Sequence, residues 1–467
     1  MTIGADPATT DAPPAWVGAL PSDLPQVERR AAMPAGFLAG ATTCGIKTSG
    51  RPDLAVIRTI GAPAAAAAVF TPNALAAAPV RLSRTHLATS QPAGGGGMGW
   101  AEAVVSTSGS ANAATGSAGD ADQAQIASLL GDILDVAPER TLHLSTGLIG
   151  TRLPLDRVEA GLRELAARLG TTDGDLEAAA VALRTTDSVT KTATATARLP
   201  GRDGATVTIT VSGIAKGVGM IHPRMATMLS VVLTDADASP AALGAVLRPV
   251  AARTWDQLSV DGDTSTNDTV FLLASGQAGN APIDAATDPG FEALRAAVEA
   301  VARDLARQQA ADGEGATTLL TCQVSGAIDD AEARAVARAV ISSSLVKAAA
   351  HGRDPNWGRI AGAAGNARLA DARVLEAGGL DPAAAAVRGG GPATVDPDRL
   401  RIAIAGHVVF DGSADGPVPF DRAAAREAMD APEVLIRLEL GLGDGVGEAF
   451  GCDLTEAYVI ENSEYTT

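Results

Sequence analysis

The chain has 467 residues, of which 46% are hydrophobic, 19% charged and only 3% aromatic, and its formal net charge is −18. This length and hydrophobic content predict a large core divided over two or three domains. A chain this acidic repels phosphate backbones and anionic lipid headgroups, so we expect neither nucleic acid nor a membrane as its partner.

The first residues and the cysteines indicate the compartment. Residues 1–25 lack the basic start and apolar centre of a signal peptide, and no apolar run reaches membrane-spanning length. The three cysteines (Cys44, Cys322 and Cys452) lie far apart, without a disulfide framework or a metal-binding spacing. We therefore expect a cytoplasmic protein with no metal and with a flexible N-terminus over residues 1–30.

Helical and strand periodicities interleave along the rest of the chain. Helical spacing predicts four helices, which start after Pro154, after Ser239, at Phe291 and near Val336, the last running toward Lys347. Apolar and alternating runs predict seven strands, at 65–70, 103–106, 206–211, 227–233, 317–324, 400–410 and 434–440. Some strand pairs are too close for crossover helices, so we expect an α/β protein built of mixed-sheet α+β layers.

Three stretches rich in glycine, alanine or small polar residues are predicted to be surface loops. They cover residues 90–99, 115–122 and 376–398. Such sequence buries too little apolar surface to offset the entropy of ordering it. The third stretch is predicted to be a loop insertion in the C-terminal half.

Residues 216–230 carry the strongest chemical signal, a glycine-containing loop followed by a threonine that opens an apolar strand. The hydroxyl of Thr227 is a weak nucleophile unless a base lies beside it, and cleavage after Ala226 would supply one as a new α-amine, whose pKa is ~7.7–8.0. Gly217 and Gly219 can adopt the strained backbone that such a cleavage needs. By themselves, however, these residues are more often typical of a plain turn before a strand.

Three further segments have both a functional and a structural interpretation. Residues 144–150 place a threonine hydroxyl and a glycine N–H in one turn, which suits an oxyanion hole but also an ordinary strand end. Residues 343–359 surround Trp357 with charged side chains and form either a pocket wall or a solvated loop. Residues 259–269 resemble a calcium loop but lack its final glutamate, so we predict a tight polar turn near the nucleophile.

Several of these segments together resemble the ornithine acetyltransferase (glutamate N-acetyltransferase) family from about Pro34 to the C-terminus. The matching segments, in the same order as in the family, are 45–55, 108–113, 145–150, 185–187, 216–229, 354–359 and 462–467. The resemblance implies the family's fold and a self-processed two-chain enzyme. Residues 31–226 would form an α chain carrying the oxyanion-hole loop, and residues 227–467 a β chain starting at the nucleophile.

The resemblance also implies the chemistry. Cleavage would fall between Ala226 and Thr227, and Thr227 would take the acetyl group of N-acetylornithine and pass it to glutamate or a related amino acid in a ping-pong reaction. Thr146 and Gly147 match the oxyanion-hole pair, and the positions matching substrate-binding residues are Thr185, Lys216, Thr227, Asn462 and Thr467. The family implies arginine biosynthesis, a heterotetramer of two α and two β chains, and no cofactor, with acetyl-CoA as an alternative donor.

Two arginines depart from the family's pattern. Arg353 stands where we expect the family's glutamate that binds the substrate ammonium, and Arg224 lies three positions before the nucleophile. A guanidinium repels an ammonium and attracts a carboxylate, so Arg353 is predicted to bind substrate and to favour a more anionic N-acyl compound of specialised metabolism. An N-terminal-nucleophile amidase and a non-catalytic binding protein are the remaining alternatives.

Overall fold

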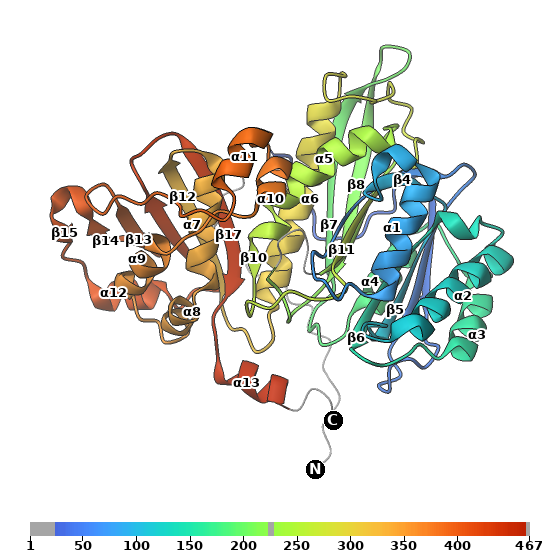
Figure 1. The fold of residues 1–467 in the computed structure, drawn as a ribbon, viewed down its shortest axis with the longest axis horizontal. Helices are drawn as coiled ribbons and strands as arrows, with labels where there is room; N and C mark the ends of the chain where they lie inside the picture. Colours follow the sequence, from blue (N-terminus) through green and yellow to red (C-terminus); the bar gives the residue numbers. More distant parts are fainter. Residues whose placement is uncertain (1–23, 223–227, 464–467) are drawn as a thin grey trace.

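Three mixed β-sheets organise the computed structural model, which describes residues 24–222 and 228–463 (Figure 1). The first sheet has the order β1-β2-β5-β6, with strands Phe37–Thr42, Leu54–Thr59, Ala103–Ser110 and Thr141–Leu148. The second has the order β4-β3-β11-β9-β8-β7, with strands Met98–Ala101, Ala64–Phe70, Thr269–Ala274, Leu229–Thr234, Thr206–Lys216 and Lys191–Pro200. Each of the two sheets contains one parallel strand pair among antiparallel pairs.

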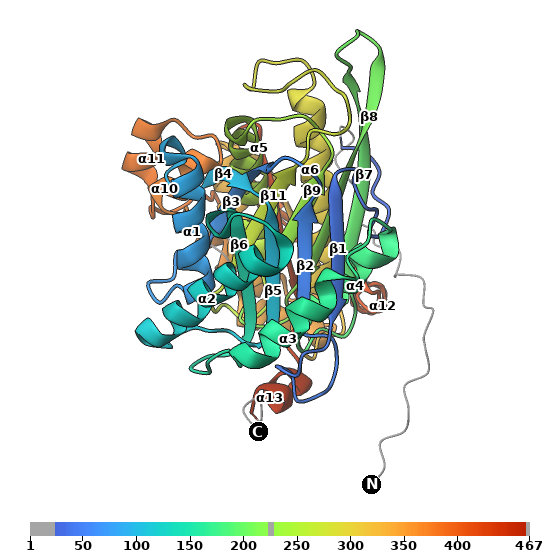
Figure 2. The same cartoon turned by 90° about the vertical axis from the view of Figure 1, so that its right-hand side faces the viewer.

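The first two sheets pack face to face in a four-layer sandwich (Figures 1 and 2). The core between them is filled by small and branched side chains and a few aromatics, such as Phe37, Leu142, Leu229 and Phe271. The outer face of the first sheet is covered by α2 (Gly116–Leu134) and α3 (Leu155–Ala166). The outer face of the second is covered by α5 (Pro240–Arg253) and α6 (Phe291–Ala311). Helices α1 (Ala78–Ser90) and α4 (Asp173–Leu183) add apolar residues to the inner core.

The third sheet forms the other lobe of the molecule (Figure 1). Its order is β10-β17-β12-β16-β13-β14-β15, with strands Leu258–Ser259, Gly445–Cys452, Leu319–Ala327, Glu433–Glu439, Arg401–Ile404, His407–Asp411 and Gly416–Pro417. The helices of this half are α7 (Asp330–Ser342), α8 (Ser344–His351), α9 (Trp357–Gly365), α10 (Ala372–Ala377), α11 (Pro382–Arg388), α12 (Arg422–Ala428) and α13 (Glu456–Ser463).

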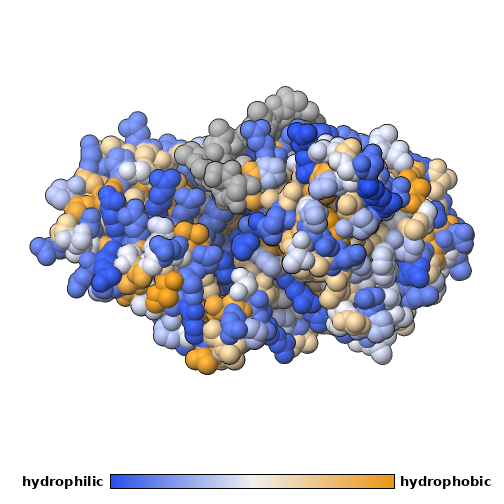
Figure 3. Space-filling model, turned by 90° about the horizontal axis from the view of Figure 1, so that it is seen from above, coloured by the Kyte–Doolittle hydropathy of each residue, from blue (hydrophilic) through white to orange (hydrophobic). Residues whose placement is uncertain are grey.

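Helix α6 joins the lobes, because Arg307 on it pairs with Glu433 on β16 at 2.8 Å, with both side chains buried. Arg303, one turn earlier, pairs with Glu448 on β17. Seen from above, hydrophobic side chains are scattered among hydrophilic ones over both lobes (Figure 3). Within residues 24–222 and 228–463, no helix is both long and apolar enough to cross a bilayer.

The mixed-sheet prediction is confirmed, and five local predictions are wrong. The run 400–410 is a hairpin, because Ala405 and Gly406 turn the chain at φ +47° and +87°. The run from Val336 toward Lys347 is two helices, because Ser343 ends α7 and caps α8. The predicted loop 115–122 opens α2, where Asp122 is buried and pairs with Arg152.

The other wrong predictions concern the supposed insertion and the N-terminus. Residues 376–398 contain α11 and the end of α10, and Ala385 on α11 is fully buried. Residues 24–30 are tied to the body, because Glu28 exchanges two backbone hydrogen bonds with Thr194 on β7 and Arg29 pairs with Asp304 on α6. The flexible segment predicted for residues 1–30 therefore does not extend over them.

Candidate active site

A cavity of about 400 Å³ lies where β6 and β8 end. It brings together five of the residues singled out in the sequence, namely Thr146, Gly147, Thr185, Lys216 and Asn462. Residues Ser265 to Asn267 of the polar turn and Glu314 complete the polar wall. Arg224, Ala226, Thr227 and Thr467 lie outside the described residues.

The oxyanion-hole candidates sit at the end of β6, in a turn that only glycine permits. Gly147 has φ +126°, and a Cβ on it would lie 2.3 Å from the carbonyl carbon of Gly109 on β5. Nζ of Lys216 donates a hydrogen bond to Oγ1 of Thr146 at 3.1 Å. Because that oxygen accepts from the lysine, the hydroxyl hydrogen of Thr146 remains available for another acceptor.

The polar turn after β10 holds this strand end in place. Nδ2 of Asn267 donates to the backbone carbonyls of Ser145 at 2.8 Å and Ala111 at 2.6 Å. Asn267 is buried, so the two bonds are shielded from water. Sequence reasoning did not assign a role to Asn267 itself.

Lys216 is the positively charged side chain in the described part of the cavity lining, and its surroundings shift its pKa. Burial lowers the pKa of Lys216, while the carboxylate of Asp187 acts in the opposite direction. Oδ1 of Asp187 accepts the backbone N–H of Gly217 at 2.8 Å and pairs with Nζ of Lys191 at 2.7 Å. Burial would raise the pKa of Asp187, but Lys191 and Lys216 hold it well below its usual range.

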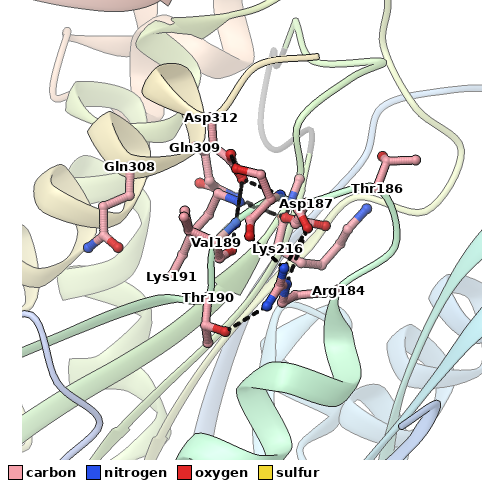
Figure 4. A network of polar contacts seen from close by, with 12 residues as sticks. Arg184, Thr186, Asp187, Val189, Thr190, Lys191, Lys216, Gln308, Gln309 and Asp312 are labelled. Carbon is pink, nitrogen blue, oxygen red and sulfur yellow. Dashed lines mark hydrogen bonds and ion pairs between the residues drawn. The ribbon is translucent and has the colours of Figure 1, made fainter. Parts of the chain in front are cut away.

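A second carboxylate extends this buried network to helix α6 (Figure 4). Asp312 follows the last residue of α6, and its Oδ2 lies 2.5 Å from Nζ of Lys191. Gln309 on α6 donates from Nε2 to the carbonyl of Lys216 at 2.8 Å. The end of β8 is therefore positioned both by the loop after α4 and by α6.

Glu314 is the carboxylate of the cavity, and sequence reasoning missed it. It is 9% exposed and accepts hydrogen bonds from Oγ1 of Thr186 at 2.9 Å and Nδ2 of Asn462 at 3.0 Å. A Cβ on Gly219 would lie 2.2 Å from its Oε2, so the loop after β8 can approach this carboxylate only as glycine. The only signal for Glu314 in the sequence was its position as an acidic residue between two glycines, Gly313 and Gly315.

Both flanks of segment 223–227 are held at the edge of the cavity. On the upstream side, the backbone N–H of Ile221 donates to Asp261 at 2.8 Å, and Oγ1 of Thr264 donates to the carbonyl of His222 at 2.9 Å. On the downstream side, Leu229 pairs with Lys216 in the antiparallel ladder of β8 and β9. The backbone around the predicted cleavage point is thus anchored from both directions.

Comparison with known proteins shows which family this architecture belongs to. The model of the ArgJ family matches residues 38–467. The chain belongs to the ArgJ family. It is 43% identical over 435 residues to the arginine biosynthesis bifunctional protein ArgJ of Thermus thermophilus, covering 93% of this chain and 99% of the relative. The Thermosynechococcus vestitus protein of the same name is 43% identical over 437 residues, covering 92% and 96%.

Two ArgJ-type crystal structures are similar to parts of the chain. The ArgJ of Bacillus halodurans is 37% identical and covers 51% of this chain and 99% of the solved chain, with a TM-score of 0.44. The ornithine acetyltransferase of Mycobacterium tuberculosis, solved with ornithine, is 36% identical and covers 42% and 97%, with a TM-score of 0.36.

Arg353 does not join the residues of the cavity in this ArgJ family member. It has φ +51°, its side chain is half exposed, and it pairs with Asp430 beyond α12. Trp357, four positions later, stacks on Phe410 of β14 with 4.9 Å between ring centroids. Of the two interpretations of residues 343–359, the structural one fits these positions. The carboxylate that lines the cavity is that of Glu314, and Arg353 is not part of the lining.

Lys347, in the same segment, also has a structural position. Its buried Nζ donates to the carbonyls of Cys452 at 2.7 Å and Ser259 at 3.2 Å, which ties α8 to β17 and β10. Among residues 24–222 and 228–463, no three His, Cys, Asp or Glu side chains come together in a way that could hold a metal ion.

Proposed function

We propose that this chain is an autoproteolytically activated N-acetyltransferase of arginine biosynthesis, which moves an acetyl group from N-acetylornithine to glutamate through an acyl-enzyme on Thr227. One observation carries the proposal. In a member of the ArgJ family, Thr146, Gly147, Lys216 and Glu314 converge on one cavity whose edge holds both flanks of segment 223–227.

Self-processing is the first step of the proposal. The hydroxyl of Thr227 attacks the carbonyl carbon of Ala226, the peptide C–N bond breaks, and the acyl group passes from nitrogen to oxygen as an ester. Water then hydrolyses the ester and leaves residues 1–226 and residues 227–467 as separate chains. Hydrogen bonds from Ile221 and to His222 support this step, because they limit the freedom of the backbone leading into it.

Acyl transfer follows with the new α-amine of Thr227 as the base. The amine takes the hydroxyl proton as the oxygen attacks the acetyl carbonyl of N-acetylornithine, and it returns the proton to the departing ornithine amine. The hydroxyl of Thr146 and the N–H of Gly147 donate to the oxyanion. Glutamate then attacks the acetyl ester and leaves as N-acetylglutamate, which restores the enzyme.

We assign the substrate-binding residues from the charges of the side chains that line the cavity. Among the described residues, the cavity lining carries one carboxylate, Glu314, and one cation, Lys216, which complement an amino acid with an ammonium and a carboxylate. We infer that Glu314 binds the side-chain ammonium of ornithine and that Thr185 and Asn462 border the same substrate. Because Arg353 lies outside the lining, it gives no support to a more anionic substrate.

We also infer the context in which the enzyme works. The α and β chains stay together as a heterotetramer of two copies each, in the cytoplasm, and the reaction needs no cofactor because the acyl group never leaves the amino acids and Thr227. Acetyl-CoA is an alternative donor that would load the same threonine.

Intact mass spectrometry tests the proposal directly. The purified wild-type protein is expected to give two chains, 1–226 and 227–467, and the second is expected to gain one acetyl group when N-acetylornithine is added. Thr227→Ala should leave one uncut chain, whereas the matched control Thr208→Ala, at an exposed position on β8, should be cut normally. Cleavage of the Thr227→Ala chain would contradict the mechanism. Release of free acetate in place of N-acetylglutamate would make the protein an amidase.

A further inference from the structure

A second polar cavity, of about 260 Å³, lies between the lobes, away from the active-site lining. It is bordered by α5, the short helix η3 (Trp255–Gln257), α7 and α10. Its lining includes three guanidinium groups, those of Arg334, Arg338 and Arg368, against one carboxylate, that of Asp256. This local excess of positive charge occurs in a chain whose net charge is −18. A basic cavity in an acidic protein attracts small anions selectively.

Arg334 is the centre of this cavity. It is 9% exposed, yet its guanidinium makes no hydrogen bond and no ion pair within 4 Å with any residue in 24–222 or 228–463. Burial lowers the pKa of Arg334, although the more distant carboxylates of Asp330 and Asp256 oppose this effect. A guanidinium that is mostly buried and has no acceptor from the protein is stabilised by an anion in the cavity.

The same guanidinium also borders an adjoining cavity of about 590 Å³. There three arginines have carboxylate partners, since Arg295 and Arg253 pair with Glu299 and Arg303 pairs with Glu448, whereas Arg437 donates to the amide oxygen of Gln323. The guanidinium of Arg334 therefore borders both cavities.

Gln257 adds a second requirement for the ligand. It is 6% exposed, and its Nε2 donates to the carbonyl of Ala252 at 2.9 Å, which fixes the orientation of the amide. Its Oε1 is buried and has no donor, and neither has the hydroxyl oxygen of Ser342 on the same cavity wall. A buried carbonyl oxygen needs an N–H or O–H group. A ligand that satisfies both sites carries an oxyanion and a donor.

His222 connects this cavity to the active site. It is part of the cavity lining, and it directly precedes segment 223–227. Its Nδ1 lies 3.0 Å from Oγ of Ser259, and its carbonyl accepts from Thr264 of the polar turn that reaches the active-site cavity. An occupant of the second cavity would therefore contact the residue that anchors the upstream flank of the cleavage segment.

We propose that the cavity around Arg334 is a binding site for a small oxyanion, a carboxylate or a phosphate, that also carries a hydroxyl or ammonium donor, and that its occupancy is linked to acyl transfer through His222. The site goes beyond the proposed catalytic function, since its ligand is not required to react.

Binding is tested with two probes, inorganic phosphate and L-malate, at constant ionic strength. For each probe, thermal unfolding and titration calorimetry measure binding to the full protein. We expect saturable stabilisation of the wild type. We also expect at least a tenfold weaker affinity in Arg334→Gln and an intermediate affinity in Arg334→Lys, which keeps the charge but not the planar fork. The matched control Arg422→Gln removes an exposed arginine far from the cavity and should bind like the wild type.

The two probes distinguish the sources of the oxyanion. If the donor requirement holds, Gln257→Leu weakens malate binding, because the malate hydroxyl loses its acceptor. Equal affinity of the wild type and both Arg334 variants would overturn the proposal, and so would a lack of saturation with either probe. If Arg334→Gln fails to fold, the comparison of the wild type with Arg334→Lys still decides the test.

The link between occupancy of the second cavity and the rate of acyl transfer is measured separately. At saturating phosphate or malate, the rate of acetyl transfer from N-acetylornithine should change in the wild type and stay constant in Arg334→Gln. An unchanged wild-type rate at saturation would overturn the linkage. Failure of the proposed acetyltransferase activity would not affect the binding measurement, so the two proposals can fail separately.

Discussion

The buried charge network behind Lys216 makes a quantitative prediction, and Asp187→Asn tests it. Asp187 has no exposed surface on its side chain, pairs with Lys191, and accepts the backbone N–H groups of Gly217 at 2.8 Å and Thr185 at 3.0 Å. Removing one partner of a buried ion pair costs about 3–5 kcal/mol. Lys191 keeps Asp312 as a second carboxylate, so we expect a loss near the lower limit, about 3 kcal/mol.

The measurement is guanidinium-induced unfolding of Asp187→Asn and its parent, both in the uncut Thr227→Ala background so that the covalent chains are comparable. Arg163→Gln is the control, because its pair with Glu159 on α3 is largely exposed and should contribute less than about 1 kcal/mol.

The pH dependence adds a second check. The pKa of Asp187 is depressed in the folded chain, so its stabilisation is fully present above the unfolded value of about 3.9 and is lost as the pH falls through the folded value. The difference between parent and variant should therefore be constant from about pH 5 to pH 8. A loss below about 1 kcal/mol, or a difference that changes across this range, would refute the assignment of a charged, paired Asp187.

Three further predictions concern the cavity and the cysteines. Gly147→Ala places a Cβ 2.3 Å from the carbonyl carbon of Gly109, so the turn must shift. Steady-state kinetics should then show acetyl transfer slowed by roughly 10²-fold or more. Normal turnover of this variant would exclude the turn as the oxyanion hole. Glu314→Gln keeps an acceptor for Thr186 but removes the charge, so kcat/KM for N-acetylornithine should fall by about 10–100-fold, while an unchanged value would place the ammonium elsewhere. Burial raises the pKa of Cys44 to about 12, aided by Asp53, and burial also raises the pKa of Cys322, so the native chain should resist iodoacetamide at about pH 8.5 while the unfolded chain is alkylated. Fast labelling of either thiol in the native chain would contradict these raised pKa values.

The local elements were largely predictable from the sequence because they depend on periodicity. The runs at 65–70, 206–211 and 434–440 are strands β3, β8 and β16, as alternation or continuous apolar sequence predicts. The errors occur where small residues hide a tertiary contact. The stretch 115–122 looks like a loop in composition, but it is the start of α2 because Asp122 and Gln123 are buried in hydrogen bonds with distant partners.

The residues of the candidate site were also predictable only in part. The oxyanion turn, Lys216 and Asn462 were found from the order of matched segments, and the structure places all of them on one cavity. The acid that completes it was assigned to the position of Arg353, because sequence alone does not tell which polar loop folds over which strand end. Glu314 reaches Thr186, 128 residues away in the chain, only because α6 carries the loop after it back to the end of β8.

The sequence by itself thus determined the family, the alternation of helices and strands, and the threonine on which the proposed chemistry rests, because these depend on local residue order. Only the tertiary structure decided which charges surround the substrate cavity. It also revealed the uncompensated guanidinium of Arg334 between the lobes, since burial and missing partners arise from packing between segments far apart in the chain.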